Sequence, residues 1–177
     1  CGLGHDVNIV SGRDTSQQSA RELLENLQPS HIVLGPGPGW PQDSPLTMEF
    51  AKLALRGDTP PLLGICLGHQ AIGLASDLKV VPSPIGPVHG TPVKCLHDGN
   101  GLFQGLKDLS MTRYNSLTLL TSECLDRESI VVDATDDTKS LVLGLRSTQA
   151  TVFGVQFHPE SVGSQSGVQI LSRFLQY

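Results

Sequence analysis

The chain has little positive charge and no long apolar run, and both absences narrow what it can be. Its 177 residues include 12 lysines and arginines against 17 aspartates and glutamates, so the formal net charge is −5. An acidic chain lacks the basic surface that attracts nucleic acids and anionic membranes. The longest apolar stretches, such as Leu62–Leu67, are far shorter than the roughly 20 residues that cross a bilayer. We therefore expect neither a nucleic-acid nor a membrane partner.

The cysteines and histidines lack the spacing of disulfide frameworks and metal sites. There are four cysteines with no CxxC pair, which favours a reducing compartment: Cys1, Cys66, Cys95 and Cys124. Histidines such as His89 and His97 have no ligand partner at helical or hairpin spacing, so no metal site is expected. No basic segment followed by an apolar one opens the sequence, so no targeting peptide is visible. We expect a cytoplasmic protein.

The order of apolar segments predicts an α/β fold in a single domain spanning residues 1–177. A chain of this length fits one core. In the first half, short β-type runs alternate with helical patterns, which is typical of parallel strands joined by helices: Asp6–Val10, Ala20–Leu27, Ile32–Leu34, Leu46–Arg56, Pro61–Ile65 and Gln70–Asp77. In the second half, predicted strands follow one another and a helix ends the chain: Val93–His97, Met111–Leu119, Ile130–Ala134, Leu141–Arg146, Thr151–Phe157 and the helix Ser166–Leu175. We expect a mixed, mainly parallel central sheet flanked by helices.

The most informative stretch runs from a buried-type strand through Gly64-Ile-Cys66-Leu-Gly68 into a helical pattern. This is the pattern of a nucleophile elbow, in which a sharp strand-to-helix turn presents the nucleophile and flanking glycines avoid Cβ clashes. The amino end of a helix favours an anionic sulfur, and the Leu67 N–H would face a developing oxyanion. The alternative is an inert buried cysteine. His69 could compete as a base, although packing is the favoured interpretation for it.

A base and its orienting group follow the last predicted strand, in Phe157-His158-Pro-Glu160-Ser161. In extended backbone, residues two apart project to the same side, so the Glu160 carboxylate can lie beside the His158 ring and fix its tautomer. A histidine in a surface loop is the alternative when this motif is taken alone.

The glycine- and proline-rich stretch Gly35–Pro41 follows another predicted strand, next to the elbow strand. Its prolines leave Gly37 and Gly39 as free amide donors, which could complete an oxyanion hole. A purely structural turn is equally compatible with this loop. It is no phosphate loop, because GxxxxGK[ST] does not occur.

Together these stretches resemble the class I, or triad-type, glutamine amidotransferases, in particular the glutaminase component of anthranilate and aminodeoxychorismate (para-aminobenzoate) synthases. The resemblance spans nearly the whole chain, in the family's order, through four motifs: Gly35–Gly39, Gly64–Gln70, Arg113–Leu117 and Gly154–Ser161. It implies a flavodoxin-like fold, no cofactor, and hydrolysis of L-glutamine with ammonia passed to a chorismate-binding synthase subunit or fused domain. Arg113-Tyr-Asn-Ser-Leu117 favours this branch over carbamoyl phosphate synthesis.

The resemblance also implies roles for individual residues. Cys66 would form a glutamyl thioester, His158 would transfer protons, and Glu160 would orient His158. The oxyanion and the two ends of the substrate would be held by the remaining family positions: Gly37, Pro38, Gly39, Leu67, Gln70, Ser116 and Leu117.

The sequence departs from the family pattern in two places. Relatives usually begin with a further strand and helix, which are apparently missing here, so we expect upstream residues to be needed for stability or activity. Relatives also commonly have lysine where this chain has Thr91, a position expected to affect the partner or its regulation. A hydrolase of γ-glutamyl compounds and a catalytically silent binding module are left open, as is the choice between the tryptophan and folate branches.

Overall fold

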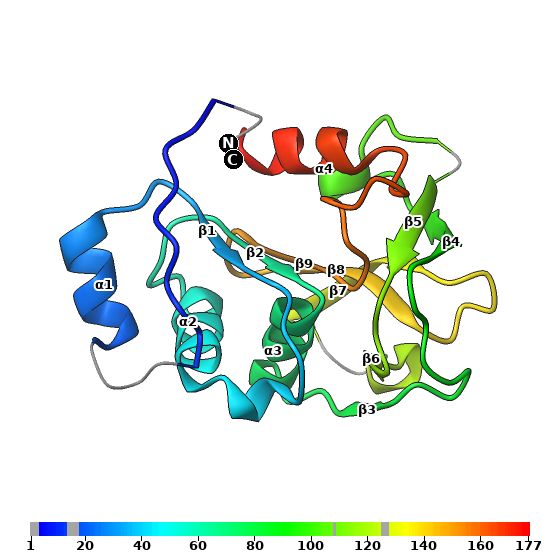
Figure 1. Ribbon diagram of the computed structural model, residues 1–177, viewed down its shortest axis with the longest axis horizontal. Coiled ribbons are helices and arrows are strands. Elements are labelled where there is room, and N and C mark those ends of the chain that lie inside the picture. The colour runs from blue at the N-terminus through cyan, green and yellow to red at the C-terminus, as the bar shows by residue number, and fades with distance from the viewer. Residues whose placement is uncertain (1–3, 14–17, 108, 125–127) are drawn as a thin grey trace.

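A seven-stranded sheet forms the centre of the computed structural model, which describes residues 4–13, 18–107, 109–124 and 128–177 (Figure 1). In spatial order its strands are β1 (Ile32–Leu34), β2 (Leu62–Ile65), β9 (Val152–Val155), β8 (Val142–Ser147), β7 (Ile130–Thr135), β4 (Thr91–His97) and β5 (Leu109–Arg113). A second, two-stranded sheet pairs β3 (Val80–Pro82) with β6 (Leu117–Leu119).

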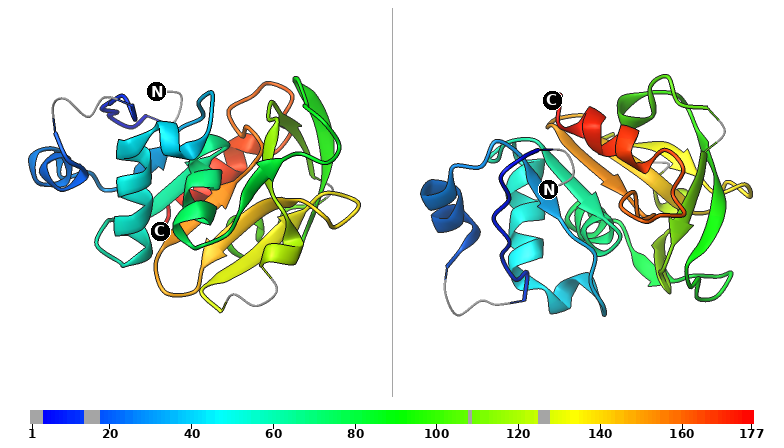
Figure 2. Two further views of the ribbon diagram at one scale, coloured as in Figure 1. Left: turned by 90° about the horizontal axis from the view of Figure 1, so that it is seen from below. Right: turned by 45° about the horizontal axis from the view of Figure 1, so that its top comes forward.

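Helices cover both faces of the central sheet, as Figures 1 and 2 show. The helices α2 (Pro45–Leu55) and α3 (Leu67–Ala75) lie on one face, and α4 (Gly167–Phe174) lies on the other. Neighbouring side chains of β2 serve opposite faces: Leu62 packs in the apolar cluster of α2 and α3, and Leu63 in the cluster of α4. A strand buried on both faces must be apolar throughout, which explains the continuous run before Cys66. The remaining helix, α1 (Ala20–Leu27), packs on α2.

The mixed sheet with flanking helices is confirmed, but its antiparallel part is larger than expected. Among the described residues, parallel pairing joins β1 to β2 and β2 to β9, whereas every other neighbouring pair of the sheet is antiparallel. The parallel part holds the strands that precede the candidate site. Because parallel strands end at the same edge of a sheet, the segments after β2 and β9 meet there.

Two predicted strands differ from the structure. Asp6–Val10 forms no strand, and Ile9 is 93% exposed, because no described strand pairs with this segment. The segment Met111–Leu119 divides into β5 and β6. The turn between them has its own bonds, since the Asn115 Nδ2 donates to the Leu117 carbonyl at 2.8 Å and the Val88 N–H donates to the Asn115 carbonyl at 3.0 Å. Strand β3, which pairs with β6, was not predicted from the sequence, because it is short and borders a proline-rich loop.

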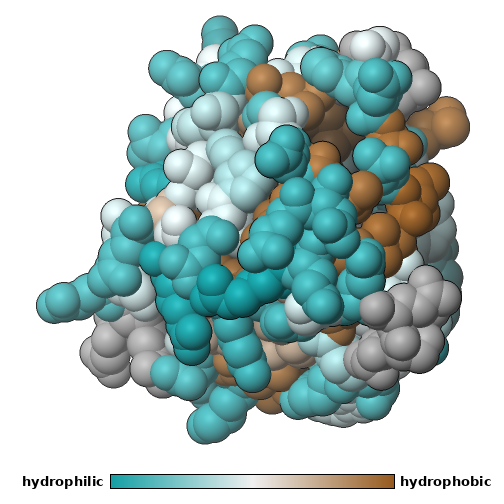
Figure 3. Space-filling model, turned by 90° about the vertical axis from the view of Figure 1, so that its left-hand side faces the viewer, coloured by the Kyte–Doolittle hydropathy of each residue, from teal (hydrophilic) through white to brown (hydrophobic). Residues whose placement is uncertain are grey.

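Figure 3 views the side of the molecule that lies on the left in Figure 1, where hydrophobic side chains interrupt a largely hydrophilic surface. Large apolar side chains exposed in the amino-terminal part of the chain are Val7, Ile9, Val10, Leu27, Val33 and Trp40. In the parts of the chain that the structure describes, no helix has the length and apolar character to cross a membrane.

Candidate active site

Cys66 occupies the sharp turn that the sequence predicts between a strand and a helix. It follows β2 directly and caps α3. Its backbone angles are φ 53° and ψ −99°, a conformation that residues other than glycine rarely adopt. Two backbone bonds hold it, because the Cys66 N–H donates to the Val155 carbonyl at 2.9 Å and the Gln70 N–H donates to the Cys66 carbonyl at 3.1 Å. A strained backbone held in this way is common at functional sites.

The glycines on either side of Cys66 are required by close backbone packing. A Cβ on Gly64 would lie 2.5 Å from the backbone of Gly68, and a Cβ on Gly68 would collide with the Leu34 carbonyl oxygen. The turn therefore closes only with glycine at both positions, as the spacing of the motif predicts.

His158 and Glu160 lie in the loop that follows β9, and their side chains are joined. The His158 Nδ1 lies 2.7 Å from the Glu160 Oε1. This loop is attached to β5, since the His158 N–H donates to the Thr112 carbonyl at 2.9 Å and the Thr112 N–H donates to the Ser164 Oγ at 3.0 Å. Within the loop, the Ser164 Oγ donates to the His158 carbonyl at 2.6 Å. Gly167, at the start of α4, leaves the space that the Pro159 carbonyl occupies. The predicted pairing of the two side chains is thus present on a fixed loop.

The surroundings of His158 keep its ring protonated at neutral pH. Burial lowers the pKa of His158, but the side chains of Cys66 and Glu160 outweigh burial and raise the pKa to about 9. Burial would raise the pKa of Glu160, but the hydrogen bond to His158 lowers it. The His158 Nε2 has no hydrogen-bond partner among the described residues, so it is available to a reacting sulfur or a leaving group. The structure therefore brings the three predicted catalytic side chains together.

The glycine- and proline-rich loop passes close to the elbow at Gly37. A Cβ on Gly37 would lie 2.9 Å from the Leu67 Cδ2, so this glycine passes the first residue of α3. Pro38 and Gly39 instead face Arg13 and Asp43: the Arg13 guanidinium donates to the Pro38 carbonyl, and a Cβ on Gly39 would lie 2.8 Å from the Asp43 Oδ2. Of these three loop residues, Gly37 is the one whose backbone passes close to the Leu67 side chain.

The predicted substrate-binding residues of α3 and β6 are linked by a hydrogen bond. The Gln70 Nε2 donates to the Leu117 carbonyl at 2.8 Å, and Ser116, one residue earlier, is exposed. Tyr114 also reaches the site, with its ring 5.0 Å from the His158 ring and its hydroxyl 3.4 Å from the Ser161 Oγ. The sequence analysis assigned no role to Tyr114. Its position within the Arg113–Leu117 motif was the feature that could have pointed to it.

His69, Cys95 and His97, which were also considered from the sequence, have other surroundings. His69 is fully buried, and burial lowers its pKa to about 4, so its ring is neutral. It packs in the interior, which is the interpretation that the sequence favoured over a role as base. Burial raises the pKa of Cys95 to about 12, which makes its thiol inert. His97 stacks on Phe103 with ring centroids 5.4 Å apart.

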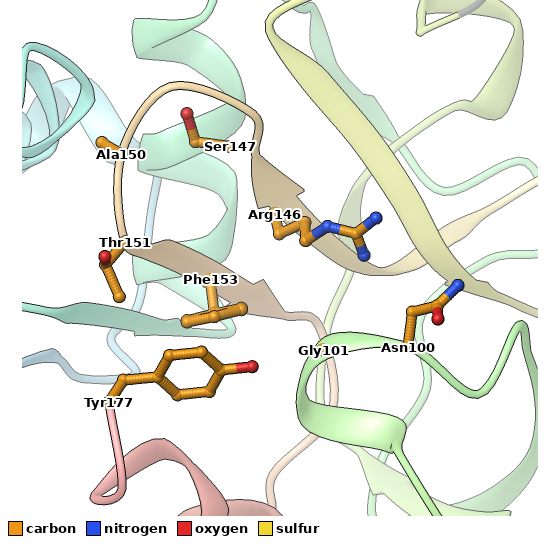
Figure 4. A pocket seen from close by; sticks show the side chains of 8 residues that line it. All are labelled: Asn100, Gly101, Arg146, Ser147, Ala150, Thr151, Phe153 and Tyr177. Atoms are coloured by element: carbon orange, nitrogen blue, oxygen red, sulfur yellow. The ribbon is translucent and has the colours of Figure 1, made fainter.

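A pocket of about 470 Å³ lies at the opposite end of the sheet, beside the start of β9 and the end of β8 (Figure 4). Phe153 and Tyr177 face each other there, and Arg146 forms an ion pair with Asp133 at 2.5 Å. Because Cys66 and His158 follow the other ends of their strands, this pocket is separate from the candidate active site.

Comparison with known proteins places these features in a family. The chain matches the profile described as glutamine amidotransferase class-I over residues 1–176. It is 38% identical to anthranilate synthase component 2 of Cyanophora paradoxa, over 96% of this chain and 87% of that protein. It is 37% identical to aminodeoxychorismate synthase component 2 of Serratia marcescens, over 99% of this chain and 89% of that protein.

The fold has a counterpart among solved structures. A putative GMP synthase subunit of Thermoplasma acidophilum superposes with a TM-score of 0.79 at 22% identity, over 99% of this chain and 82% of that chain. By its sequence and its fold, this chain belongs to the class-I glutamine amidotransferases.

Proposed function

We propose that this chain hydrolyses the side-chain amide of L-glutamine and delivers the ammonia to a chorismate-using synthase. The observation that carries the proposal is a strained Cys66 beside an imidazole that a carboxylate orients at 2.7 Å. Relatives named as components of anthranilate and aminodeoxychorismate synthases support the choice of acceptor. Residues 1–177 would form one amidotransferase domain, and the described cysteines, none of them in a disulfide, fit a reducing, cytoplasmic location.

In the first half of the reaction, the Cys66 sulfur, as a thiolate whose proton has passed to His158, attacks the amide carbon of glutamine. The C–N bond breaks, His158 gives its proton to the departing nitrogen, and a γ-glutamyl thioester and ammonia result. The raised pKa of His158, about 9, fits an imidazolium that is ready to donate this proton. The Leu67 amide, at the start of α3, and the amide of Gly37, whose backbone passes the Leu67 side chain, would stabilise the negative oxygen.

In the second half, the neutral His158 takes a proton from water, and the water oxygen attacks the thioester carbon. The C–S bond breaks, glutamate is released, and the Cys66 thiolate and the protonated His158 are regenerated. Glu160 holds the ring in one tautomer through its bond to Nδ1, so that Nε2 faces the reacting atoms in both halves. Gln70 and the Ser116–Leu117 backbone would hold the amino and carboxylate ends of glutamine. Pro38 and Gly39 would shape the approach to the oxyanion site.

The test is glutamate release from L-glutamine by the full-length protein that contains this chain, with and without a chorismate-using synthase partner, and with Cys66→Ala as the comparison. We expect activity that the partner stimulates and that the substitution abolishes. Glutamate release that ignores every synthase partner would favour a hydrolase that releases ammonia to solvent. A folded, partner-bound chain that never forms glutamate would favour a silent binding module.

A further inference from the structure

A chain of buried hydrogen bonds lies behind the proposed substrate-binding residues and crosses from β5 to the end of β9. The Arg113 Nε donates to the Asn115 Oδ1 at 3.0 Å, and the Asn115 Nδ2 donates to the Leu117 carbonyl at 2.8 Å. The same carbonyl accepts from the Gln70 Nε2 at 2.8 Å, and that nitrogen also donates to the Gln156 Oε1 at 3.0 Å. None of the four polar side chains is more than 4% exposed.

This network fixes which end of the Gln70 amide is free. A backbone carbonyl can only accept a hydrogen bond, so the amide nitrogen of Gln70 must face Leu117. Both hydrogens of that nitrogen are used, one by Leu117 and one by Gln156. The Gln70 Oε1 accepts no hydrogen bond from any described residue. An amide held in this way presents an acceptor, which suits a protonated amine and is unsuited to a carboxylate.

We infer that Asn115 and Gln156 are positioning residues that hold the Gln70 amide with its oxygen toward the α-ammonium group of the substrate. The inference rests on the proposed function and goes beyond it, because neither residue touches glutamine in that proposal. Arg113 completes the network by fixing the Asn115 side chain, so that its nitrogen and not its oxygen meets the Leu117 carbonyl.

A purely structural role explains this network poorly. Two of its buried nitrogens, the Arg113 Nη2 and the Gln156 Nε2, have no hydrogen-bond partner among the described residues. Buried donors left unpaired cost stability, and well-packed apolar side chains of similar size often serve a core better. A network kept at that cost is expected where the orientation of a group matters to the site.

Two substitutions test the inference. Asn115→Asp keeps the size of the side chain and the acceptor for Arg113 but removes the donor to Leu117, and Gln156→Met removes the acceptor for Gln70. Asn100→Asp is the matched control, since it makes the same chemical change at an exposed residue of the distant pocket. Each protein, with its synthase partner, is assayed for ammonia release from L-glutamine and from glutaramate, which has the same amide but no α-amino group.

The measured quantity is the ratio of kcat/KM for L-glutamine to kcat/KM for glutaramate. Because both substrates are assayed on the same sample, the ratio does not depend on the fraction of protein that is folded. We expect the ratio to fall about tenfold or more in both variants and to stay unchanged in the control. An unchanged ratio in Asn115→Asp and Gln156→Met overturns the inference, even if both rates fall together. A wild-type chain that releases no ammonia from glutamine contradicts the proposed function instead.

Discussion

The His158 ring is bonded to the Glu160 side chain, and its ionisation depends on Glu160 and on Cys66. Burial alone would lower the pKa of His158, but both neighbours raise it. Since the folded pKa of about 9 exceeds the usual value of roughly 6.5, the stabilisation from this proton is complete below pH 6.5. It is lost as the pH rises through 9.

Replacing Glu160 with glutamine tests this assignment. Glu160→Gln removes the anion beside Nδ1, so the pKa of His158 should fall from about 9, and glutamate release should drop by roughly tenfold to a hundredfold. An NMR titration of the His158 ring measures the pKa directly. Glu25→Gln, the same change at an exposed position of α1, should alter neither quantity. A His158 pKa that stays at about 9 in Glu160→Gln would show that Glu160 is not its partner.

His69 shows the opposite behaviour, because burial lowers its pKa to about 4 and leaves it neutral when folded. A group of this kind supports the fold above its unfolded pKa of roughly 6.5, and that support is lost as the pH falls toward 4. The free energy of unfolding of the wild type should therefore fall between pH 7 and 4, by roughly 3 kcal/mol from this residue. Chemical denaturation of His69→Gln should show a smaller fall over the same range, and an equal fall would exclude His69 as the cause.

At the scale of elements, the site depends on how closely α3 approaches β1. The Leu34 carbonyl at the end of β1 occupies the space of a Cβ on Gly68, so helix and strand come together only without that carbon. Gly68→Ala should lower the free energy of unfolding by roughly 3 kcal/mol, because backbone on both sides must move. Gly35→Ala should change it little, since a Cβ there meets nothing within 4 Å. Denaturant unfolding of both variants compares them, and equal stabilities would refute the packing argument.

Patterns within one element were predictable from the sequence, and features that depend on pairing between elements were not. Glycine spacing predicted the turn at Cys66, and the two-residue spacing within Phe157–Ser161 predicted that the His158 and Glu160 side chains pair. The exposed Asp6–Val10 segment has the apolar pattern of a strand, but such a pattern does not indicate whether a partner strand is present. The bond from Gln70 to Gln156 was equally hidden, since it depends on how α3 lies against β9.

At the scale of the whole molecule, the two ends of the sheet differ, and among the described residues the β1 edge has no further strand. The catalytic side chains follow the carboxyl ends of β2 and β9, whereas β1 forms an edge on which no described strand pairs. Val33, in the middle of β1, is 51% exposed. Exposed edge strands with apolar side chains tend to pair with other chains.

We therefore expect the 177-residue chain to self-associate as its concentration rises, through β1. Val33→Lys should weaken this association by placing a charge on the edge strand. Val168→Lys, at a similarly exposed valine on α4, should not. Sedimentation velocity over a concentration series compares the association of the three proteins. If the two lysine variants associate to the same extent, β1 is excluded as the contact.

The central claim is that Cys66 is the nucleophile, and the most direct test is to trap the covalent intermediate. The chain with its synthase partner is mixed with L-glutamine, quenched in acid and analysed by intact mass and peptide mapping. We predict an added γ-glutamyl group on the peptide that contains Cys66 and no such group in Cys66→Ala. A γ-glutamyl group on Cys95 or Cys124, or undiminished glutamate release by Cys66→Ala, would contradict the account.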